Sequence, residues 1–272
     1  MSLIKKINQL VPRNLKFLFK RFLPRFLIYR HYKNQLFGTI EIETYSPCNL
    51  KCPTCPVANN PRPKTTLSEE TWRKVINELK DLDFRGTLSP HFYNEPLMDK
   101  RIVDLLDYAK TQLPHIKIVI FTNAILLNHE MFEKLDNLVD HFQITIDQLN
   151  IKKAVDKLVE QLNERQIAKL NTRTIMKDAL SNRGGSIEVE DEDLKPVLQC
   201  SFPINNMTID ASGDVHLCCN DFFGSVKYGN IIHDSLSTIW FSKRFINDGV
   251  DILRGRFKYK ICKCCKSTDR FK

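Results

Sequence analysis

The sequence lacks the hydrophobic stretches that enter or cross membranes. The longest apolar run in its N-terminal part covers residues 26–29. A signal-peptide core needs roughly 7–15 apolar residues and a membrane span about 20. The chain also has no internal repeat and no low-complexity segment. We therefore expect a cytoplasmic globular protein, and 272 residues suit one large domain with a small appendage.

Acidic residues are absent from the first forty positions, which hold nine of the 41 lysines and arginines. The other 32 basic residues balance the 32 acidic ones, so the net charge of +9 belongs to an N-terminal arm, residues 1–36. Because the body is neutral, a nucleic-acid partner is not expected. The arm mixes leucine and phenylalanine with basic residues, which leaves two interpretations open. It either caps the core as an ordinary helix or makes a peripheral contact with an anionic membrane.

Cysteine is absent from residues 56–199, yet the chain has nine cysteines. Three lie within eight residues and six lie in the last quarter: Cys48, Cys52, Cys55, then Cys200, Cys218, Cys219, Cys262, Cys264 and Cys265. Without a secretory signal, disulfides are not expected and metal binding becomes the favoured role. This distribution predicts two metal sites, one in each half of the chain.

Candidate strands alternate with candidate helices along the middle of the chain. Alternating or apolar strand patterns occur at residues 38–44, 87–93, 116–121, 141–146 and 172–176. Ser68 and Asp99 are expected to cap two of the intervening helices, and a third covers residues 152–162. Such alternation predicts an α/β fold, a partial parallel (β/α) barrel.

The C-terminal ends of barrel strands carry the chemistry in such folds. The first cysteine group, Asn94–Glu95 and Thr122–Asn123 each follow a predicted strand, so we expect them to face one cavity. A glycine pair and an acidic run break the pattern within residues 178–199. We therefore predict a barrel over residues 37–194 and a small cysteine-rich domain over residues 195–272.

The first cysteine group reads Cys48-Asn-Leu-Lys-Cys52-Pro-Thr-Cys55. Three thiolates can hold three corners of a 4Fe–4S cluster and leave one iron open, and an open coordination site makes a metal reactive. Zinc or unligated thiols are the alternative. The motif resembles the signature of the radical S-adenosylmethionine (SAM, AdoMet) superfamily.

The resemblance implies that the open iron chelates AdoMet. An external one-electron donor such as flavodoxin or ferredoxin then drives its cleavage, and the 5′-deoxyadenosyl radical abstracts a substrate hydrogen. It also implies that Glu95 receives the methionyl ammonium and that Asn123 helps to bind AdoMet. Asn94 and Ala124 depart from the glycines that the family usually has beside them. A surface salt-bridge residue and a turn residue are the alternatives for Glu95 and Asn123.

The second cysteine group resembles the SPASM domain in its shortened, twitch form. The resemblance implies an auxiliary 4Fe–4S cluster held by Cys200, Cys218, Cys262 and Cys265. Residues 207–217 are expected to form a hairpin that turns at Ser212-Gly213-Asp214. A zinc ribbon is the alternative for this group.

Three further residues are candidate catalytic groups. Cys219 and Cys264 are left over beside proposed ligands, so each is either an incidental thiol or a hydrogen-atom donor of the kind that some radical SAM epimerases use. Arg183 lies in a segment that resembles BtrN-type dehydrogenases, which oxidise a secondary alcohol of an aminocyclitol. That resemblance implies a substrate contact, and a plain surface arginine is the alternative.

These features predict a radical SAM enzyme, of oxidoreductase type, that oxidises or epimerises a small polyol, sugar or aminocyclitol. In the oxidation, the substrate radical loses a proton and the auxiliary cluster accepts the second electron. A ribosomal-peptide maturase is a second enzymatic hypothesis. A zinc-dependent interaction module, whose basic arm meets membrane or RNA, is the non-enzymatic one.

Overall fold

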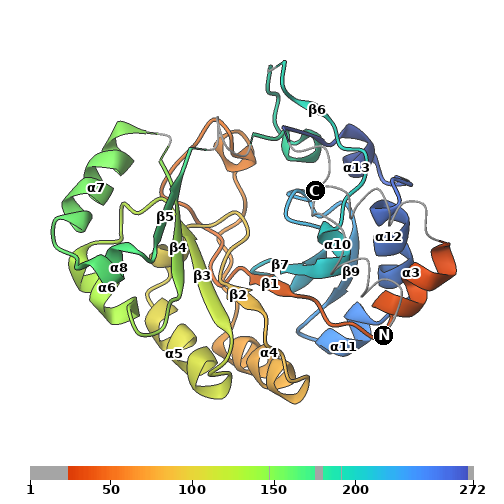
Figure 1. Cartoon of the computed structure of the whole chain (residues 1–272), viewed down its shortest axis with the longest axis horizontal. Helices are drawn as coiled ribbons and strands as arrows, with labels where there is room; N and C mark the ends of the chain where they lie inside the picture. The colour runs from red at the N-terminus through yellow and green to blue at the C-terminus, as the bar shows by residue number, and fades with distance from the viewer. Residues whose placement is uncertain (1–23, 147, 175–179, 191, 269–272) are drawn as a thin grey trace.

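The fold is built on one eight-stranded sheet in the order β5-β4-β3-β2-β1-β7-β8-β9 (Figure 1). It comes from a computed structural model, which describes residues 24–146, 148–174, 180–190 and 192–268. The strands are β1 (Thr39–Ile42), β2 (Thr87–Ser89), β3 (Lys117–Thr122), β4 (His141–Thr145), β5 (Leu170–Arg173), β7 (Asn206–Ile209), β8 (Asp214–His216) and β9 (Lys227–Asn230). Strands β1 to β5 and β7 pair in parallel, and β8 and β9 pair antiparallel. The predicted α/β fold with a largely parallel sheet is confirmed.

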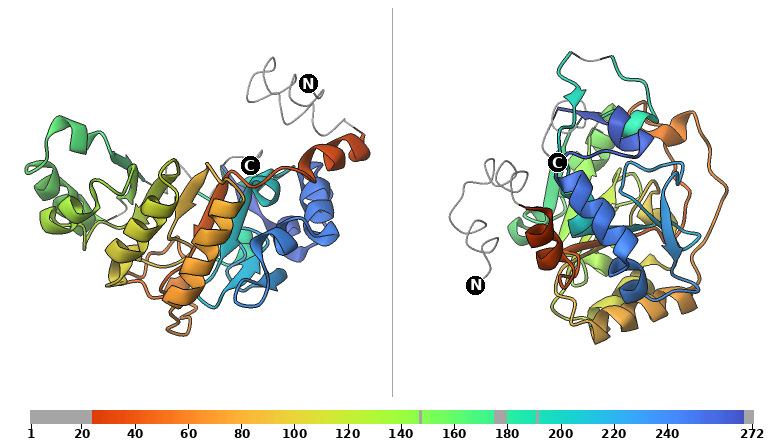
Figure 2. Two further views of the ribbon diagram at one scale, coloured as in Figure 1. Left: turned by 90° about the horizontal axis from the view of Figure 1, so that it is seen from below. Right: turned by 90° about the vertical axis from the view of Figure 1, so that its right-hand side faces the viewer.

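Helices link the parallel strands and cover the outer face of the curved sheet (Figure 2). They are α4 (Glu69–Asp81), α5 (Ile102–Gln112), α6 (His129–Leu135), α7 (Leu149–Val159) and α8 (Glu164–Ile167). The C-terminal region adds α10 (Phe202–Asn205), α11 (Leu236–Trp240), α12 (Lys243–Leu253), α13 (Lys260–Cys264) and the short pair β6 (Lys195–Pro196) and β10 (Lys266–Ser267). Three 3₁₀ turns are η1 (Pro56–Ala58), η2 (Pro96–Met98) and η3 (Arg183–Gly185).

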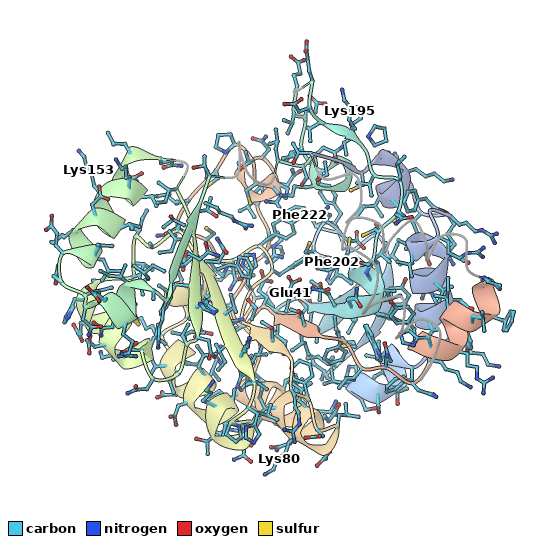
Figure 3. The ribbon with its side chains drawn as sticks, viewed as in Figure 1. Glu41, Lys80, Lys153, Lys195, Phe202 and Phe222 are labelled. Atoms are coloured by element: carbon cyan, nitrogen blue, oxygen red, sulfur yellow. The ribbon has the colours of Figure 1, made fainter. Side chains whose placement is uncertain are left out.

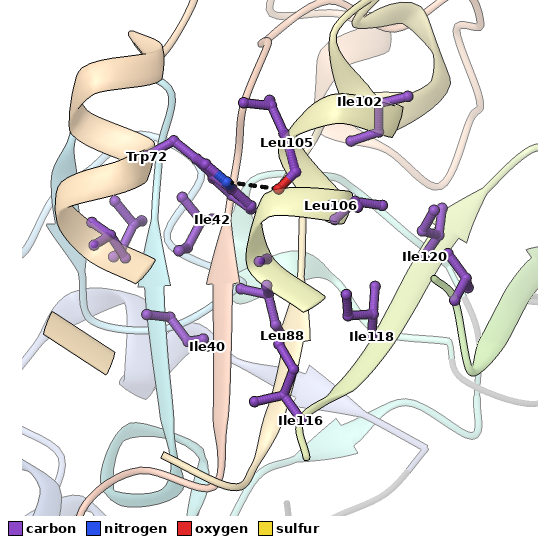
Figure 4. Close-up of a cluster of buried hydrophobic side chains, with 14 of the residues drawn as sticks. Ile40, Ile42, Trp72, Leu88, Ile102, Leu105, Leu106, Ile116, Ile118 and Ile120 are labelled. Atoms are coloured by element: carbon purple, nitrogen blue, oxygen red, sulfur yellow. Dashed lines mark hydrogen bonds between the residues drawn. The ribbon is translucent and has the colours of Figure 1, made fainter. Parts of the chain in front are cut away.

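The main hydrophobic core lies between the sheet and helices α4 and α5 (Figure 4). Ile40 and Ile42 on β1 are fully buried in it, because alternate side chains of a strand face the same side. Trp72 of α4 donates a hydrogen bond from its indole nitrogen to the Leu105 carbonyl, at 2.9 Å, which ties α4 to α5. The same alternation turns Glu41 to the opposite, inner face of the sheet.

The C-terminal region continues the barrel sheet. Strand β7 pairs in parallel with β1, in the register Ile40 to Met207, and the hairpin β7–β8 follows. The hairpin predicted for residues 207–217 is confirmed, and Gly213 takes a left-handed φ of 83° at its turn. The second cysteine group is therefore attached to the strand that precedes the first group.

Two predicted strands and two predicted helix starts differ most from the structure, and the other three predicted strands agree within two residues at each end. Strand β2 ends at Ser89 instead of Tyr93, because the amide of Asn94 bonds to Phe92 N–H and the Pro90 carbonyl and turns the chain. Strand β5 covers Leu170–Arg173 instead of residues 172–176, of which 175 and 176 lie outside the described residues.

Helix α7 begins at Leu149, three residues before the predicted start. The cap predicted at Asp99 is wrong: Arg101 is the N-cap of α5. The Asp99 carboxylate instead accepts the Arg101 backbone N–H at 3.1 Å and pairs with its guanidinium. Ser68 caps α4 as predicted, and its hydroxyl accepts the Thr71 N–H at 3.0 Å.

Helix α3 (Arg25–Tyr32) packs against α12 (Figures 1 and 2). Ile28 and Tyr32 are buried against α12, and Arg25 pairs with Asp251 at 2.9 Å. This part of the arm caps the C-terminal region, whereas residues 1–23 lie outside the described residues. None of the described helices has the length and apolar character that a membrane span requires.

A buried carboxylate joins the first cysteine loop to both sides of the sheet. Glu43, just after β1, accepts a hydrogen bond from Arg62 at 2.5 Å, from Tyr93 N–H at 3.2 Å and from Ala211 N–H at 3.2 Å. Its side chain is 1% exposed and that of Arg62 is 16% exposed. The pair therefore holds four separate segments around one buried charge.

We predict that Arg62→Ala destabilises the protein by roughly 3–5 kcal/mol, because it leaves the Glu43 charge buried without its cation. Denaturant unfolding under anaerobic conditions measures the change. The control is Arg85→Ala, whose exposed pair with Asp83 should contribute less than about 1 kcal/mol. Equal effects of the two substitutions would contradict the role of the buried pair.

Candidate active site

A cavity of about 350 Å³, the main cavity, opens at the C-terminal ends of the parallel strands. It is lined by Glu41, Cys48, Cys52, Thr54, Cys55, His91, Phe92, Tyr93, Asn94, Glu95, Phe121, Thr122, Asn123, Thr145, Arg173, Arg183, Phe202 and Cys219. The first cysteine group and the segments after β2 and β3 thus share one cavity, as predicted from the strand order.

The first cysteine loop presents all three thiols to the main cavity. Cys55 N–H bonds to the Cys52 carbonyl at 3.0 Å, which closes the turn between them. Burial raises the pKa of the Cys48 thiol, while the backbone N–H groups of Leu50 and Asn49 lower it. Burial also raises the pKa of Cys55, while the backbone N–H of Val57 lowers it. These N–H groups aim at sulfur and favour the thiolate form that iron binds.

Glu95 lies at the end of the turn after β2 with its carboxylate held by three donors. They are Thr122 Oγ1 at 2.8 Å, Asn123 N–H at 2.8 Å and Leu97 N–H at 3.1 Å. Burial raises the pKa of Glu95, and these hydrogen bonds lower it. A carboxylate held in this way, on the wall of the main cavity, suits the binding of an ammonium group. It is not a surface salt-bridge residue, because it is 1% exposed.

Asn123 connects the third strand to the cysteine loop. Its amide nitrogen donates to Asn49 Oδ1 at 2.7 Å, and its backbone N–H donates to Glu95. The next residue, Ala124, is buried with a left-handed φ of 58°, a conformation that glycine adopts without strain. The turn therefore keeps the glycine-like geometry although the residue is alanine. At Asn94 no such geometry is needed, since its φ is not positive.

The second cysteine group surrounds another cavity, the tail cavity, of about 60 Å³. Cys200, Cys218, Cys262 and Cys265 all line it, together with Cys219. Burial and the nearby thiols of Cys200 and Cys265 raise the pKa of Cys262 to about 12, and burial also raises that of Cys218. Thiols gathered in this way disfavour each other's ionisation, so ionisation of the group calls for a compensating positive charge.

The donor sets fit iron–sulfur clusters better than zinc. A zinc ion needs its donors within about 2–2.3 Å of one point. Over the described ranges, no three His, Cys, Asp or Glu side chains gather as closely as a single ion requires. Cysteines that line a cavity suit a cluster, whose ligands bind separate irons. Cys48, Cys52 and Cys55 would hold three irons of one cluster. Cys200, Cys218, Cys262 and Cys265 would supply four ligands to the other.

The candidate catalytic residues lie at different places. Arg183 and Cys219 line the main cavity, and Cys219 also lines the tail cavity. Cys264 lines neither; it is exposed in a separate surface pocket beside Arg183 and Gly185. Arg183 has a left-handed φ of 48°, and such strained backbone is concentrated at functional sites.

Sequence reasoning missed four ionisable residues on the wall of the main cavity. They are Glu41, His91, Tyr93 and Arg173. Burial raises the pKa of Glu41 to about 7, while the Thr208 hydroxyl lowers it. Burial and the charges of Arg183 and Arg173 lower the pKa of His91 to about 3. The inward face of β1 was the one available signal, because Glu41 alternates with Ile40 and Ile42.

Comparison with known proteins finds a matching family model for each half of the chain. Residues 42–174 match the family model of the radical SAM superfamily, and residues 200–266 match that of the SPASM iron–sulfur cluster-binding domain. The chain therefore carries a radical SAM domain followed by a SPASM domain. It is an oxidoreductase-type enzyme that uses AdoMet and two 4Fe–4S clusters.

Within that class, the chain is similar to a dehydrogenase. The S-adenosyl-L-methionine-dependent 2-deoxy-scyllo-inosamine dehydrogenase of Niallia circulans is 28% identical over 240 residues, 86% of this chain and 95% of the relative. The crystal structure of BtrN in complex with AdoMet and 2-DOIA matches with a TM-score of 0.78 and 28% identity, over 85% and 93% of the two chains. The structure of anSMEcpe with bound AdoMet, at 11% identity, TM-score 0.52 and coverage of 77% and 81%, shares the fold.

The raised pKa of Glu41 predicts a pH-dependent difference in stability between the wild type and Glu41→Gln. In the unfolded chain the carboxyl ionises near pH 4.5, but in the folded protein it ionises near 7. The wild type therefore loses stability relative to the variant as the pH rises from 4.5 to 7, by up to about 3 kcal/mol, and the difference is constant above that. Unfolding of the reconstituted protein at pH 5, 6, 7 and 8 measures it. A difference that does not change with pH would contradict the buried, protonated carboxyl.

Proposed function

We propose that this chain oxidises a secondary hydroxyl of a small polyol, sugar or aminocyclitol to a ketone. The main support is the arrangement of the two cavities: Phe202 and Cys219 line both of them. A substrate in the main cavity then lies next to the site of the auxiliary cluster. The similarity to the 2-deoxy-scyllo-inosamine dehydrogenase makes that aminocyclitol the first substrate to test.

The bound groups supply radical and redox chemistry: AdoMet at the open iron gives the hydrogen-abstracting radical, and the auxiliary cluster takes one electron. The chain's own residues orient the reactants. Glu95 receives the methionyl ammonium, because its carboxylate faces the main cavity and is fixed by Thr122 and Asn123. Arg183, which also lines the main cavity, donates hydrogen bonds to a substrate hydroxyl. Flavodoxin or ferredoxin is the proposed electron donor.

The test is anaerobic reconstitution followed by incubation with AdoMet, dithionite and 2-deoxy-scyllo-inosamine. The wild type should bind about eight irons per chain and release 5′-deoxyadenosine together with a ketone. Cys52→Ala should abolish both products, since the reactive cluster loses a ligand. Cys262→Ala should lower the ketone at least tenfold more than it lowers 5′-deoxyadenosine.

Lys263→Ala is the matched control, because Lys263 is exposed beside Cys262 and should give both products at the wild-type level. A colourless protein that holds stoichiometric zinc would contradict the proposal and favour the interaction module. A ketone yield that is equally sensitive to Lys263→Ala would remove the argument for the tail cluster.

An epimerase is the second candidate function, and the position of Cys219 on the wall of the main cavity favours it. A thiol there could return a hydrogen atom to the substrate radical. Turnover in D₂O separates the two functions. A dehydrogenase should give the ketone and leave the recovered alcohol free of solvent deuterium, and Cys219→Ser should retain the ketone. Inverted alcohol that carries solvent deuterium, and that is lost in Cys219→Ser, would establish the epimerase instead.

A further inference from the structure

Two glutamates on β1 and its continuation point to the inner face of the sheet, but their surroundings differ. The Glu43 carboxylate accepts hydrogen bonds from Arg62, Tyr93 N–H and Ala211 N–H. Among the described residues, Glu41 accepts one hydrogen bond, from the Thr208 hydroxyl to Oε2 at 2.8 Å. Glu41 lines the main cavity, whereas Glu43 does not. Figure 3 shows Glu41 at the centre of the molecule, where the two halves of the sheet meet.

Oxidation of an alcohol through a carbon radical needs a proton acceptor. Removal of one hydrogen atom from carbon leaves a radical that still carries the hydroxyl proton. A ketone forms only when the O–H bond also breaks and one electron leaves. When bound, AdoMet would supply the radical that removes the hydrogen atom and the auxiliary cluster would accept the electron, so the hydroxyl proton needs an acceptor of its own on the cavity wall.

Most titratable groups in the main cavity are poor proton acceptors. Arg173 and Arg183 are cations with no acceptor atom. His91 is a weak base, since burial and the nearby arginines lower its pKa to about 3. Burial raises the pKa of Tyr93, which therefore remains a neutral phenol.

The other titratable groups of the main cavity, apart from Glu41, already have a proposed role other than accepting the proton. The carboxylate of Glu95 already accepts three hydrogen bonds and faces the methionyl ammonium. The cysteines of the first loop are the proposed iron ligands, and Cys219 adjoins Cys218, a proposed ligand of the tail cluster. Glu41 is the one carboxylate on this cavity wall, among the described residues, with a single hydrogen-bond donor.

We propose that Glu41 is the general base of the oxidation and takes the proton from the substrate hydroxyl. This inference rests on the proposed function. The substrate O–H bond breaks, the proton moves to a Glu41 carboxylate oxygen, and the electron pair stays on the substrate oxygen. With the hydrogen atom and the electron removed as above, the alcohol loses two electrons and two protons in all and becomes a ketone.

The local environment suits this role. A base acts best when its pKa lies near the working pH, and burial raises the pKa of Glu41 to about 7. Thr208 on the neighbouring strand β7 fixes one carboxylate oxygen by its hydroxyl and leaves the other for the substrate. Thr208 is a positioning residue, because it acts through Glu41.

The experiment compares ketone formed per 5′-deoxyadenosine released across pH 5.5–8.5, in the reconstituted enzyme with 2-deoxy-scyllo-inosamine. In the wild type this ratio should rise with pH, and the midpoint of the rise, the limb of the pH profile, should lie near pH 7. Glu41→Gln, which keeps the shape of the side chain, should lower the ratio roughly 100-fold and remove the limb. Glu41→Asp should restore part of the ratio together with a limb.

Substitutions at Thr208 supply the matched pair. Thr208→Val removes the hydroxyl that lowers the pKa of Glu41, so the limb should move to higher pH. Thr208→Ser keeps the donor and should keep the limb at its wild-type position. If the role of Glu41 were purely structural, Glu41→Gln would lower the ratio by the same factor at every pH.

The outcomes separate the two claims. No ketone from the wild type with 2-deoxy-scyllo-inosamine, myo-inositol or scyllo-inositol overturns the proposed function and the inference with it. Ketone from the wild type with an unchanged limb in Glu41→Gln overturns the inference alone. A raised KM with unchanged kcat and pH profile also overturns it, because Glu41 would then bind the substrate without taking its proton.

Discussion

The buried charge of Glu43 is the constraint on which the arrangement of the site depends. A carboxylate that is 1% exposed is costly unless it is paired and hydrogen-bonded, so its partners must come to it. The partners are a guanidinium from the end of the cysteine loop, a backbone N–H after β2 and one from the hairpin that follows β7. One side chain thus fixes the cysteine loop, the end of the second strand and the C-terminal region relative to β1.

Because side chains alternate along β1, one face of the strand packs in the hydrophobic core and the other carries the polar residues of the site. Ile40 and Ile42 enter the core under the helices, where they are fully buried. Glu41 and Glu43 face inward, where polar groups have partners only if loops or a ligand supply them. Because the inner face ends at the main cavity, a polar residue there serves either to hold the loops, as Glu43 does, or to meet the substrate, as we infer for Glu41.

The sequence predicted those parts of the site that depend on local chemistry. The cysteine spacing, the Ser68 cap and the turn at Gly213 involve residues close in the chain. Glu95 was predicted from its place just after a candidate strand and from the resemblance to the radical SAM superfamily. The pairing of β7 with β1 was not predictable, since it joins segments more than 160 residues apart. For the same reason His91, Tyr93 and Arg173 were missed: nothing near them in the chain shows that they share a cavity.

The shared sheet also explains how two clusters can serve one substrate. If the C-terminal region were a separate module, thermal motion would vary the gap between the two cavities. Here β7 is hydrogen-bonded to β1 along its whole length, and α3 ties the N-terminal side to α12. Phe202 and Cys219 then form a fixed wall between the main cavity and the tail cavity. In the proposed oxidation the electron passes from the main cavity to the tail cavity, so the residues that line both cavities are constrained from both sides.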